Sequence, residues 1–453
     1  MVKQFLSEDP RANLALNIVR KLRTAGFDAL LVGGCVRDLI LGRHPDDYDV
    51  ATSARPNQVS ALFPRSVQIG AKFGVILVVD GHDKVEVATF RKESGYSDRR
   101  HPDRVEFSDA RNDALRRDFT INGLFMDTET GEIIDYVGGQ ADIAAGIVRA
   151  IGCPRARFEE DALRILRALR FASTLGYQIE DKTWEAIRDL AGLIRDISAE
   201  RIRDELVKGF TRRNPDRFLQ LLYDSGLLEI IMPEVAAMKG CEQPPEYHPE
   251  GDVFTHTKLM LALLRRDPSP TLAFATLLHD VGKPVTATRE GNRIRFNGHD
   301  RAGAEIADQI CRRLAFSNEA RQRIVDMVER HMGYINLPRM REATLRRFLA
   351  HDNIDEELEL HRVDCASSHR RMDNYELATR RLAEFRAYQP DDQLPPPLVN
   401  GRDLIALGLK PGPRFRELLT AVQDAQLEGQ VQTRQEALEL LHQLVARQNL
   451  PAR

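Results

Sequence analysis

The sequence lacks most features that mark membrane, secreted or disulfide-bonded proteins. No apolar run reaches about eighteen residues, the length that a helix needs to cross a bilayer. Met1–Asp9 has no apolar core of a secretory signal peptide. The five cysteines are scattered without a C-x-x-C pair, which argues against a disulfide framework or a zinc ribbon. These absences favour a cytoplasmic protein that has no membrane partner.

A net basic charge is lacking as well. The 453 residues carry a formal net charge of −3, with 42% hydrophobic and 29% charged residues, as in ordinary soluble globular proteins. Any site for a polyanion must therefore be a local basic patch. We find no internal repeat and no low-complexity tract. The length exceeds what one core accommodates, so about two to four domains are expected.

The pattern of apolar residues changes near Gly146. Before it, short apolar runs alternate with turns, and we expect strands in DALLVGG, YDVAT, SVQIG, VILVVDG, KVEVATF and EIIDYVGG. Helices are expected there over Asn13–Ala25, Asn57–Phe63 and Asp113–Arg117. Later in the chain, helical periodicity dominates over Glu159–Leu175, Thr183–Leu190, Ala199–Phe210 and from Phe254 to about Tyr388.

The predicted fold class is α+β, with a mixed head followed by an all-helical body that ends near Asn449. Two Pro-rich segments, Gln243–Pro249 and Gln389–Pro397, resemble linkers. Together with the change near Gly146, they predict domains over residues 1–145, 146–240, 241–390 and 391–453.

The segment LVGGCVRDLILGRHPDDYDVAT, Leu31–Thr52, combines a glycine pair with an acid-x-acid triplet. In an extended strand, Asp47 and Asp49 would project from one face, and two carboxylates there suit Mg²⁺. Bare amides at Gly33 and Gly34 and the guanidinium of Arg37 would suit a triphosphate. The alternatives are a solvated turn and a plain strand-to-helix connection. The glycine spacing does not match a Rossmann motif.

This segment resembles the first motif of the tRNA nucleotidyltransferase and poly(A) polymerase family, in its bacterial-eukaryotic class. LRRDFTINGLFMD (Leu115–Asp127) resembles the second motif, RFEEDALRILRALRFASTLGY (Arg157–Tyr177) the nucleotide-selecting motif, and ISAERIRDEL (Ile197–Leu206) the next motif along the chain. The matches are collinear. They imply a polymerase-β-like nucleotidyltransferase head at 1–145 and a helical neck at 146–240.

The resemblance implies roles at the matching positions. Asp47 and Asp49 would hold the catalytic Mg²⁺ ions, and Glu86 is the candidate for a third carboxylate, although it could equally be a paired surface acid. The residues that would contact the nucleotide are Gly33, Gly34, Arg37, Arg117, Asp118, Asn122, Asp161, Arg164, Arg167 and Arg170. Asp161 and Arg164 resemble the pair that imitates a Watson–Crick partner for C or A, while Arg167 and Arg170 would reach the triphosphate.

Helical spacing places Asp161, Arg164, Arg167 and Arg170 in one stripe, with Leu163, Leu166 and Leu169 toward the core. The simpler interpretation is a solvated, internally paired face. However, Arg149–Arg170 contains six arginines and three acids. That excess predicts that anions bind there, because like charges would otherwise repel one another. In the family, a polar loop such as Ser94–Phe107 helps to switch selection from C to A, and its presence weighs against an enzyme that adds CC alone.

A second set of possible ligands lies later in the chain: His256, His279, Asp280, His299, His331 and Asp364. The order H…HD…H…H…D resembles HD-domain metal phosphohydrolases, which implies one or two divalent metals, of which Mn, Fe, Co or Ni suit imidazole better than Mg²⁺ does. The alternative is a set of structural histidines in a domain that has lost its activity. We set aside His248, Asp300, His361 and His369 as unrelated to this site.

The last segment, LVNGRDLIALGLKPGPRFRELLTAVQDAQLEGQVQTRQEALELL, also resembles the family and would contact the tRNA acceptor stem, with Asn400 and Asp403 at a helix start. The sequence thus predicts a CCA-adding tRNA nucleotidyltransferase that uses CTP and ATP, with a phosphohydrolase as a further activity. The alternatives are an A-adding enzyme, a poly(A) polymerase, and an HD phosphohydrolase with an RNA-binding head. The sequence does not predict an oligomeric state.

Overall fold

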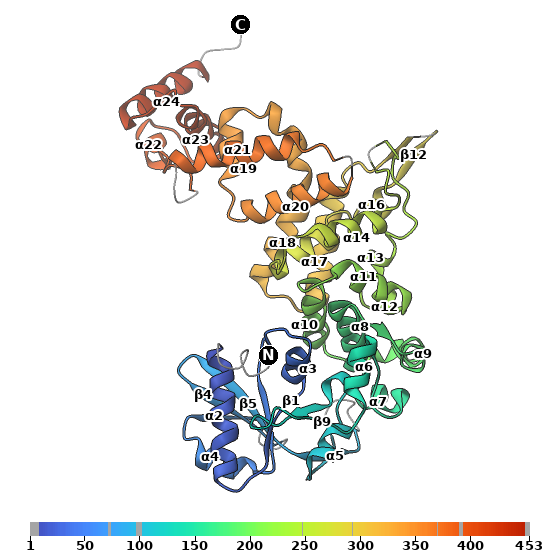
Figure 1. The fold of residues 1–453 in the computed structure, drawn as a ribbon. Helices are drawn as coiled ribbons and strands as arrows, with labels where there is room; N and C mark the ends of the chain where they lie inside the picture. Colours follow the sequence, from blue (N-terminus) through green and yellow to red (C-terminus); the bar gives the residue numbers. More distant parts are fainter. Residues whose placement is uncertain are drawn as a thin grey trace. The chain divides into compact units, whose positions relative to one another are not determined.

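The computed structural model of the chain describes residues 9–70, 74–96, 102–246, 248–291, 293–368, 370–388 and 393–448. The chain divides into two compact units, which can be followed by colour in Figure 1. The first unit contains Met1–Ala236, Arg266–Pro268 and Arg312–Phe316, and the second contains Ala237–Arg265, Ser269–Cys311 and Ser317–Arg453. Within the described ranges, no helix is both long enough and apolar enough to cross a membrane.

The head of the first unit is built on a seven-stranded mixed sheet with the strand order β3-β4-β5-β2-β1-β8-β9. The strands are β1 (Ala29–Val32), β2 (Asp49–Thr52), β3 (Ser66–Gly70), β4 (Val75–Asp80), β5 (Asp83–Thr89), β8 (Leu124–Met126) and β9 (Ile133–Asp135). All except β8 lie in the apolar runs from which strands were predicted. The β2–β5 pair is parallel, and the other neighbouring strands are antiparallel.

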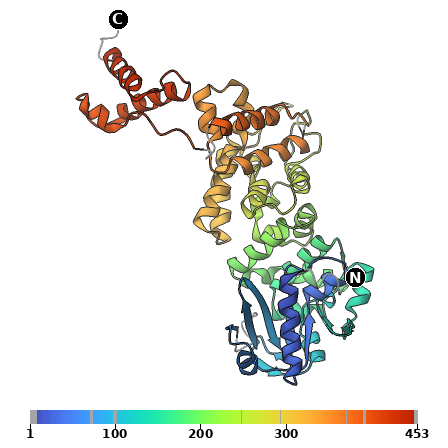
Figure 2. The ribbon, with the colours of Figure 1, turned by 60° about the vertical axis from the view of Figure 1, so that its left-hand side comes forward.

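Helices cover both faces of this sheet. Helix α2 (Pro10–Thr24) packs against β1, β2 and β5, and Figure 2 shows it in front of the strands. The other face, which carries Val32, Ala51 and Phe125, packs against Ala114 of α5 (Ala110–Leu115). Because strand residues alternate between faces, Asp49 shares the face of Ala51. The head also contains α3 (Gly34–Ile40), α4 (Pro56–Leu62) and α6 (Gly139–Ala145).

The polar segment Ser94–Phe107 is not a loop throughout. Its two ends pair as the antiparallel strands β6 (Arg91–Ser94) and β7 (Arg104–Phe107). Residues 97–101, at the centre of the loop that was predicted to switch selection, lie outside the described residues.

The remainder of the first unit is mainly helical, as predicted. Its elements are α7 (Pro154–Glu160), α8 (Leu163–Leu175), α9 (Asp181–Leu190), η3 (Ala191–Asp196), α10 (Ala199–Phe210), α11 (Pro215–Asp224), α12 (Leu227–Ile231) and α13 (Pro233–Ala236). Leu163, Leu166 and Leu169 are buried, as the helical periodicity predicted. A short parallel pair, β10 (Ile147–Val148) with β11 (Gln178–Ile179), was not predicted, because two residues are too few to establish a pattern.

The prediction of one continuous helix over Glu159–Leu175 is wrong. Helix α7 ends at Glu160, and Asp161 is extended, with φ −148° and ψ 103°. The Asp161 Oδ1 atom accepts a hydrogen bond from the backbone N–H of Leu163 at 3.1 Å. Aspartate side chains compete in this way with helical backbone hydrogen bonds, and the chain therefore restarts as α8.

The second unit contains the helices α14 (Val253–Leu263), α15 (Pro270–Leu278), α16 (Lys283–Thr286), α17 (His299–Arg313), α18 (Asn318–Arg330), η4 (His331–Arg339), α19 (Glu342–Leu349), α20 (Ile354–Ser367), α21 (Asp373–Tyr388), α22 (Gly401–Ala406), α23 (Pro413–Leu427) and α24 (Arg434–Gln448). An exposed hairpin, β12 (Thr288–Glu290) with β13 (Arg293–Arg295), interrupts the region predicted to be helical. As expected, Asn400 starts a helix, and Asp403 completes its capping box. Helices α22 to α24 share a small apolar core.

Candidate functional site

Asp47, Asp49 and Glu86 lie near the N-terminal end of β2, close enough for their charges to interact. Asp49 is the first residue of β2, and Asp47 precedes it in a bend rather than in the strand. Glu86, on β5, lies directly opposite Asp49 in the parallel pair, so both side chains project from the same face. Burial, the charge of Glu86 and the charge of Asp47 raise the pKa of Asp49 to about 6 against the opposing effect of Arg117. A divalent cation would relieve this repulsion, so the residues fit the Mg²⁺ that the family implies.

The backbone at Gly33 closely approaches this site. Gly33 has φ +82° and precedes α3. A Cβ atom there would lie 3.2 Å from Arg117 Nη1 and 3.9 Å from Asp49 Oδ2. Both the backbone conformation and the lack of space therefore favour glycine. Gly34 is the next residue and the first of α3.

The predicted nucleotide contacts form a hydrogen-bonded network. Arg37 Nη1 donates to Asn122 Oδ1 at 2.6 Å, and Asn122 Nδ2 donates to Asp118 Oδ1 at 3.3 Å. Arg167 donates through Nε and Nη2 to Asp118 Oδ2, at 2.9 and 2.7 Å. Although burial alone would raise the pKa of Asp118, the Arg167 guanidinium lowers it to about 2. Asp118 is therefore ionised at neutral pH, and these four residues hold one another in place.

The predicted base-selecting pair lies at the break between α7 and α8. Arg201, on α10, donates to Asp161 Oδ2 at 2.8 Å. Glu160 Oε2 accepts from Arg164 Nη1 at 2.6 Å. Arg201 of the next motif and Glu160 of the same motif thus orient the two side chains.

The inference that the arginine excess in Arg149–Arg170 requires bound anions is wrong. Carboxylates from other elements pair with several of these arginines: Asp142 lies 3.1 Å from Arg149, and Glu205 lies 2.6 Å from Arg170. Sequence spacing could not reveal these partners, because they come from segments that only the fold brings near. A cleft of about 650 Å³ nevertheless lies beside Asp47, and Arg37, Arg170, Lys208 and Arg212 contribute to its walls.

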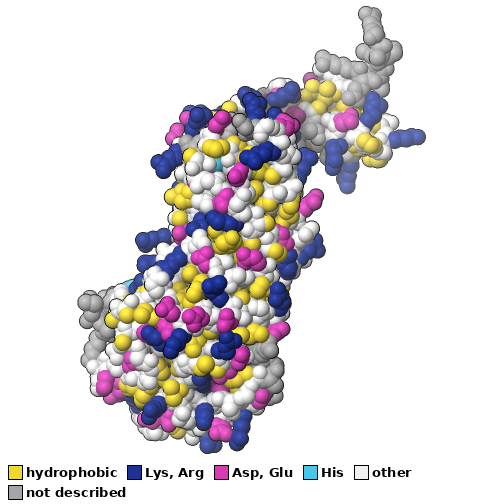
Figure 3. Space-filling model, turned by 90° about the vertical axis from the view of Figure 1, so that its right-hand side faces the viewer, with side chains coloured by type: hydrophobic (Ala, Val, Ile, Leu, Met, Phe, Trp, Pro, Cys, Tyr) yellow, Lys and Arg dark blue, Asp and Glu magenta, His cyan; other side chains and the backbone are white. Residues whose placement is uncertain are grey.

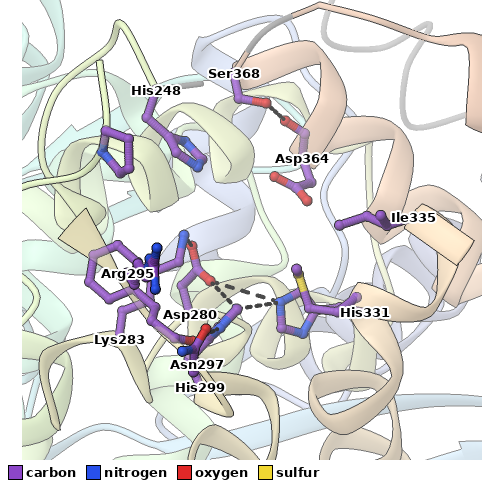
Figure 4. A pocket seen from close by; sticks show the side chains of 13 residues that line it. His248, Asp280, Lys283, Arg295, Asn297, His299, His331, Ile335, Asp364 and Ser368 are labelled. Atoms are coloured by element: carbon purple, nitrogen blue, oxygen red, sulfur yellow. Dashed lines mark hydrogen bonds and ion pairs between the residues drawn. The ribbon is translucent and has the colours of Figure 1, made fainter. Parts of the chain in front are cut away.

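The second candidate site lies in the HD region, and Figure 4 shows its predicted ligands Asp280, His299, His331 and Asp364 around one cavity. His279 follows α15, His299 begins α17, and His331 follows α18, while His256 and Asp364 lie on α14 and α20. The residues form two groups, His256–His279–Asp364 and Asp280–His299–His331. Asp280 faces both groups: its Oδ2 lies 3.1 Å from His279 Nε2, and its Oδ1 lies 3.5 Å from His299 Nε2 and 3.8 Å from His331 Nε2.

Each of the four histidines is held through Nδ1. His279, His299 and His331 contact the backbone carbonyls of Thr276, Phe296 and Val328 at 2.8, 2.7 and 2.6 Å. A carbonyl only accepts, so each Nδ1 carries the proton, and Nε2 is left with a lone pair. The fourth, His256, contacts Glu250 Oε1 at 2.7 Å. Metal-binding histidines are oriented in this way.

Several buried ligand atoms lack hydrogen bonds. They are His256 Nε2, His279 Nε2 and both carboxylate oxygens of Asp280, although the ammonium of Lys283 forms an ion pair with Asp280 Oδ2 at 2.6 Å. Leaving such atoms unsatisfied is costly unless a cation completes the site. Burial would lower the pKa of His256, but Asp364 and Glu250 raise it to about 9, because the group attracts a positive charge. The residues fit the divalent metals that an HD domain implies.

Sequence analysis missed residues that border this site. The segment Gln243–Pro249 was expected to be a linker, and His248 was set aside, but Pro244 and His248 line the cavity at the metal ligands, and Gln243 contacts its Lys283. A sequence signal existed, because Glu250 lies close to both His248 and His256 in the chain. His361 stacks on Tyr334, away from the ligand groups, and His369 lies outside the described residues.

Family models match three parts of the chain. The Poly A polymerase head domain matches residues 29–149, the "Probable RNA and SrmB- binding site of polymerase A" matches 176–239, and the HD domain matches 253–368. These matches show that the chain carries a Poly A polymerase head domain over residues 29–149 and an HD domain over residues 253–368.

The individual relatives are CCA-adding enzymes. Those of Lactobacillus helveticus and Lactiplantibacillus plantarum are 45% and 42% identical over 226 and 254 residues, which are 50% and 55% of this chain. The match covers 56% and 62% of those relatives, so the chain spans little more than half of their length. The crystal structure of the Bacillus stearothermophilus CCA-adding enzyme in complex with CTP is 29% identical, with a TM-score of 0.74, over 97% of this chain and 99% of that one.

Proposed function

We propose that the protein is a template-independent CCA-adding tRNA nucleotidyltransferase. It would transfer CMP and AMP from CTP and ATP to the 3′ end of tRNA and release pyrophosphate. The observation that carries this proposal is the pairing of Asp49 with Glu86 on one face of the sheet, beside Asp47, Gly33 and Arg117. The CCA-adding relatives and the structure that contains CTP support the same activity.

In the proposed reaction, the terminal hydroxyl oxygen of tRNA forms a bond to the α-phosphorus of the nucleotide. The bond between the α-phosphorus and the oxygen that bridges it to the β-phosphate breaks at the same time. Mg²⁺ bound by Asp47, Asp49 and Glu86 would lower the pKa of that hydroxyl and neutralise charge on the phosphates. Gly33 and Gly34 have no side chains that would block the triphosphate from their backbone amides. Arg37 and Arg117 supply positive charge beside it. Arg167 and Arg170, which were expected to reach the triphosphate, pair with Asp118 and Glu205.

Asp161 and Arg164 would select the base. The Asp161 carboxylate accepts from the amino group that cytosine and adenine share, and Arg164 donates to a ring nitrogen or carbonyl. Uracil and guanine present a carbonyl oxygen where the amino group is required, so that oxygen would face the Asp161 carboxylate without a donor, at a cost of about 1–3 kcal/mol. Arg201 and Glu160 hold the pair ready.

Asp161→Ala is therefore expected to reduce the preference for CTP over UTP about 10- to 100-fold. The preference is measured as the ratio of kcat/KM values for single incorporation into a tRNA that ends before CCA. Asp189→Ala serves as the control, since Asp189 forms an exposed ion pair with Arg155. An unchanged ratio in Asp161→Ala would assign base selection to other residues.

Three tRNA transcripts test the whole proposal. They end before CCA, after C and after CC, and each is incubated with CTP, ATP or both in the presence of Mg²⁺. We expect all three to grow to one common end. Addition of a single A to the CC-ended transcript alone would identify an A-adding enzyme, and longer A tails would identify a poly(A) polymerase.

The C-terminal helices α22 to α24 would contact the acceptor stem. On the face shown in Figure 3, Lys and Arg side chains are interspersed with Asp and Glu. Contacts between this face and RNA phosphates must therefore come from small groups of basic residues. Binding that depends on phosphates should weaken as salt increases. As an enzyme acting on tRNA, the protein is expected in the cytoplasm.

We further propose that the HD region is a metal-dependent phosphohydrolase. The specific observation is the convergence of the Nε2 atoms of His279, His299 and His331 on the Asp280 carboxylate. A divalent transition metal such as Mn, Fe, Co or Ni would supply an activated water for attack on a phosphoester. The two ligand groups would hold the metal.

A further inference from the structure

Residues 240–252 lie between the parts of the chain that match the RNA-binding and HD models, 176–239 and 253–368. Two buried side chains from this stretch nevertheless contact the HD site. Glu250 contacts the predicted metal ligand His256, and Gln243 contacts Lys283, which is paired with the predicted ligand Asp280. The stretch therefore forms part of the HD site, although it lies outside the residues that match the HD model.

Glu250 holds a metal ligand by a side chain rather than by local backbone. Its Oε1 contacts His256 Nδ1 at 2.7 Å and His248 Nδ1 at 2.8 Å, and the Glu250 side chain is 6% exposed. The other three histidines are held by backbone carbonyls three residues earlier in the chain. Among the four, only His256 depends for its orientation on a separate segment.

Gln243 holds the ammonium group of Lys283. Lys283 Nζ donates to Gln243 Oε1 at 2.7 Å and lies 2.6 Å from Asp280 Oδ2, and Gln243 and Lys283 are 4% and 6% exposed. An ammonium has three N–H donors, so one remains for a ligand. Lys283 lines a cavity of about 380 Å³ with Arg295 and His248, next to Asp280 and Asp364 (Figure 4).

We propose that residues 240–252, called the wall below, line the HD centre and orient two of its side chains. Glu250 positions His256 for a divalent metal, and Gln243 positions Lys283 for an anionic oxygen of a phosphate ester. Both are positioning residues. The proposal rests on the proposed HD function. It adds that the wall comes from residues outside the matched HD domain and that metal and anion binding depend on it separately.

The role of Glu250 is tested with Co²⁺ and the full chain. Glu250→Leu is expected to weaken Co²⁺ binding about 10- to 100-fold and to change the visible absorption spectrum of the bound ion. Glu250→Gln should retain part of the affinity, because an amide oxygen still accepts from His256. Glu246→Gln, an exposed acid of the same segment, is the matched control. Unfolding curves and tRNA extension by the head show whether each variant is folded.

The role of Gln243 is tested with inorganic phosphate added to the Co²⁺-loaded chain, with the spectral shift as the readout. Gln243→Leu should weaken phosphate binding about tenfold while leaving Co²⁺ affinity within about twofold. Gln243→Glu should retain part of the phosphate affinity that Gln243→Leu loses. Lys283→Met is the reference for complete loss of the contact.

These outcomes distinguish the proposed HD function from the role of the wall. If the unaltered chain binds no Co²⁺, the proposed HD function fails. If it binds Co²⁺ but Glu250→Leu and Glu250→Gln bind it with unchanged affinity and spectrum, the role of Glu250 is overturned. If Lys283→Met loses phosphate and Gln243→Leu does not, the role of Gln243 is overturned.

Discussion

Asp49→Asn is expected to lower the rate of CMP incorporation by at least about 10³-fold. Burial and the charges of Glu86 and Asp47 raise the pKa of Asp49. The substitution removes one of the charges that would hold Mg²⁺ beside the phosphates. The measurement is single-turnover extension of a tRNA that ends before CCA, with products resolved to one nucleotide. The affinity for tRNA should change little, because the substitution does not remove a basic group.

Two companions sharpen this prediction. Asp80→Asn is the control, since Asp80 lies in an exposed pair with Arg65 at the end of β4. Glu86→Gln asks whether the register partner of Asp49 is the third carboxylate, in which case the rate should also fall by orders of magnitude. Unchanged incorporation by the double variant Asp47→Ala/Asp49→Ala would refute the proposed active site.

Asp280→Asn is expected to weaken divalent metal binding at the HD site at least about 100-fold. Its two carboxylate oxygens face different ligand groups, so one substitution affects both. An amide also presents an N–H₂ group, which cannot bind a cation. The measurements are metal content after dialysis and titration with Co²⁺, both of which are independent of any hydrolytic activity.

Asp300→Asn provides the comparison, because Asp300 follows His299 but belongs to neither ligand group. Extension of tRNA by the Asp280→Asn protein should remain near that of the unaltered chain, since the residues proposed for nucleotidyl transfer lie in the other compact unit. Full metal content in Asp280→Asn would show that these histidines do not form a metal centre.

The difference between sequence and structure is clearest at Asp161. Helical spacing correctly placed Leu163, Leu166 and Leu169 in the core, because a buried face needs one apolar residue per turn. The same spacing extended the helix through Asp161, where a side-chain hydrogen bond to Leu163 N–H ends that regularity. Periodicity averages over many residues and does not detect one local competitor.

The HD site shows a second limit. The sequence contained every member of the two ligand groups, but proline content led to Gln243–Pro249 being interpreted as a linker. Prolines restrict the backbone whether a segment joins domains or lines a cavity. Only the fold shows that Gln243 reaches Lys283 and that His248 and His256 share Glu250.

By itself, the sequence determined most strands of the head, the helical character of the chain beyond Gly146, and the presence of the polymerase head and HD domains. These are local properties, since each depends on residue types at short spacing. The tertiary structure alone decided that Glu86 lies opposite Asp49, that Asp118 pairs with Arg167, and that Asp280 faces two ligand groups. Such pairs join residues far apart in the chain, so strand register and helix packing place them.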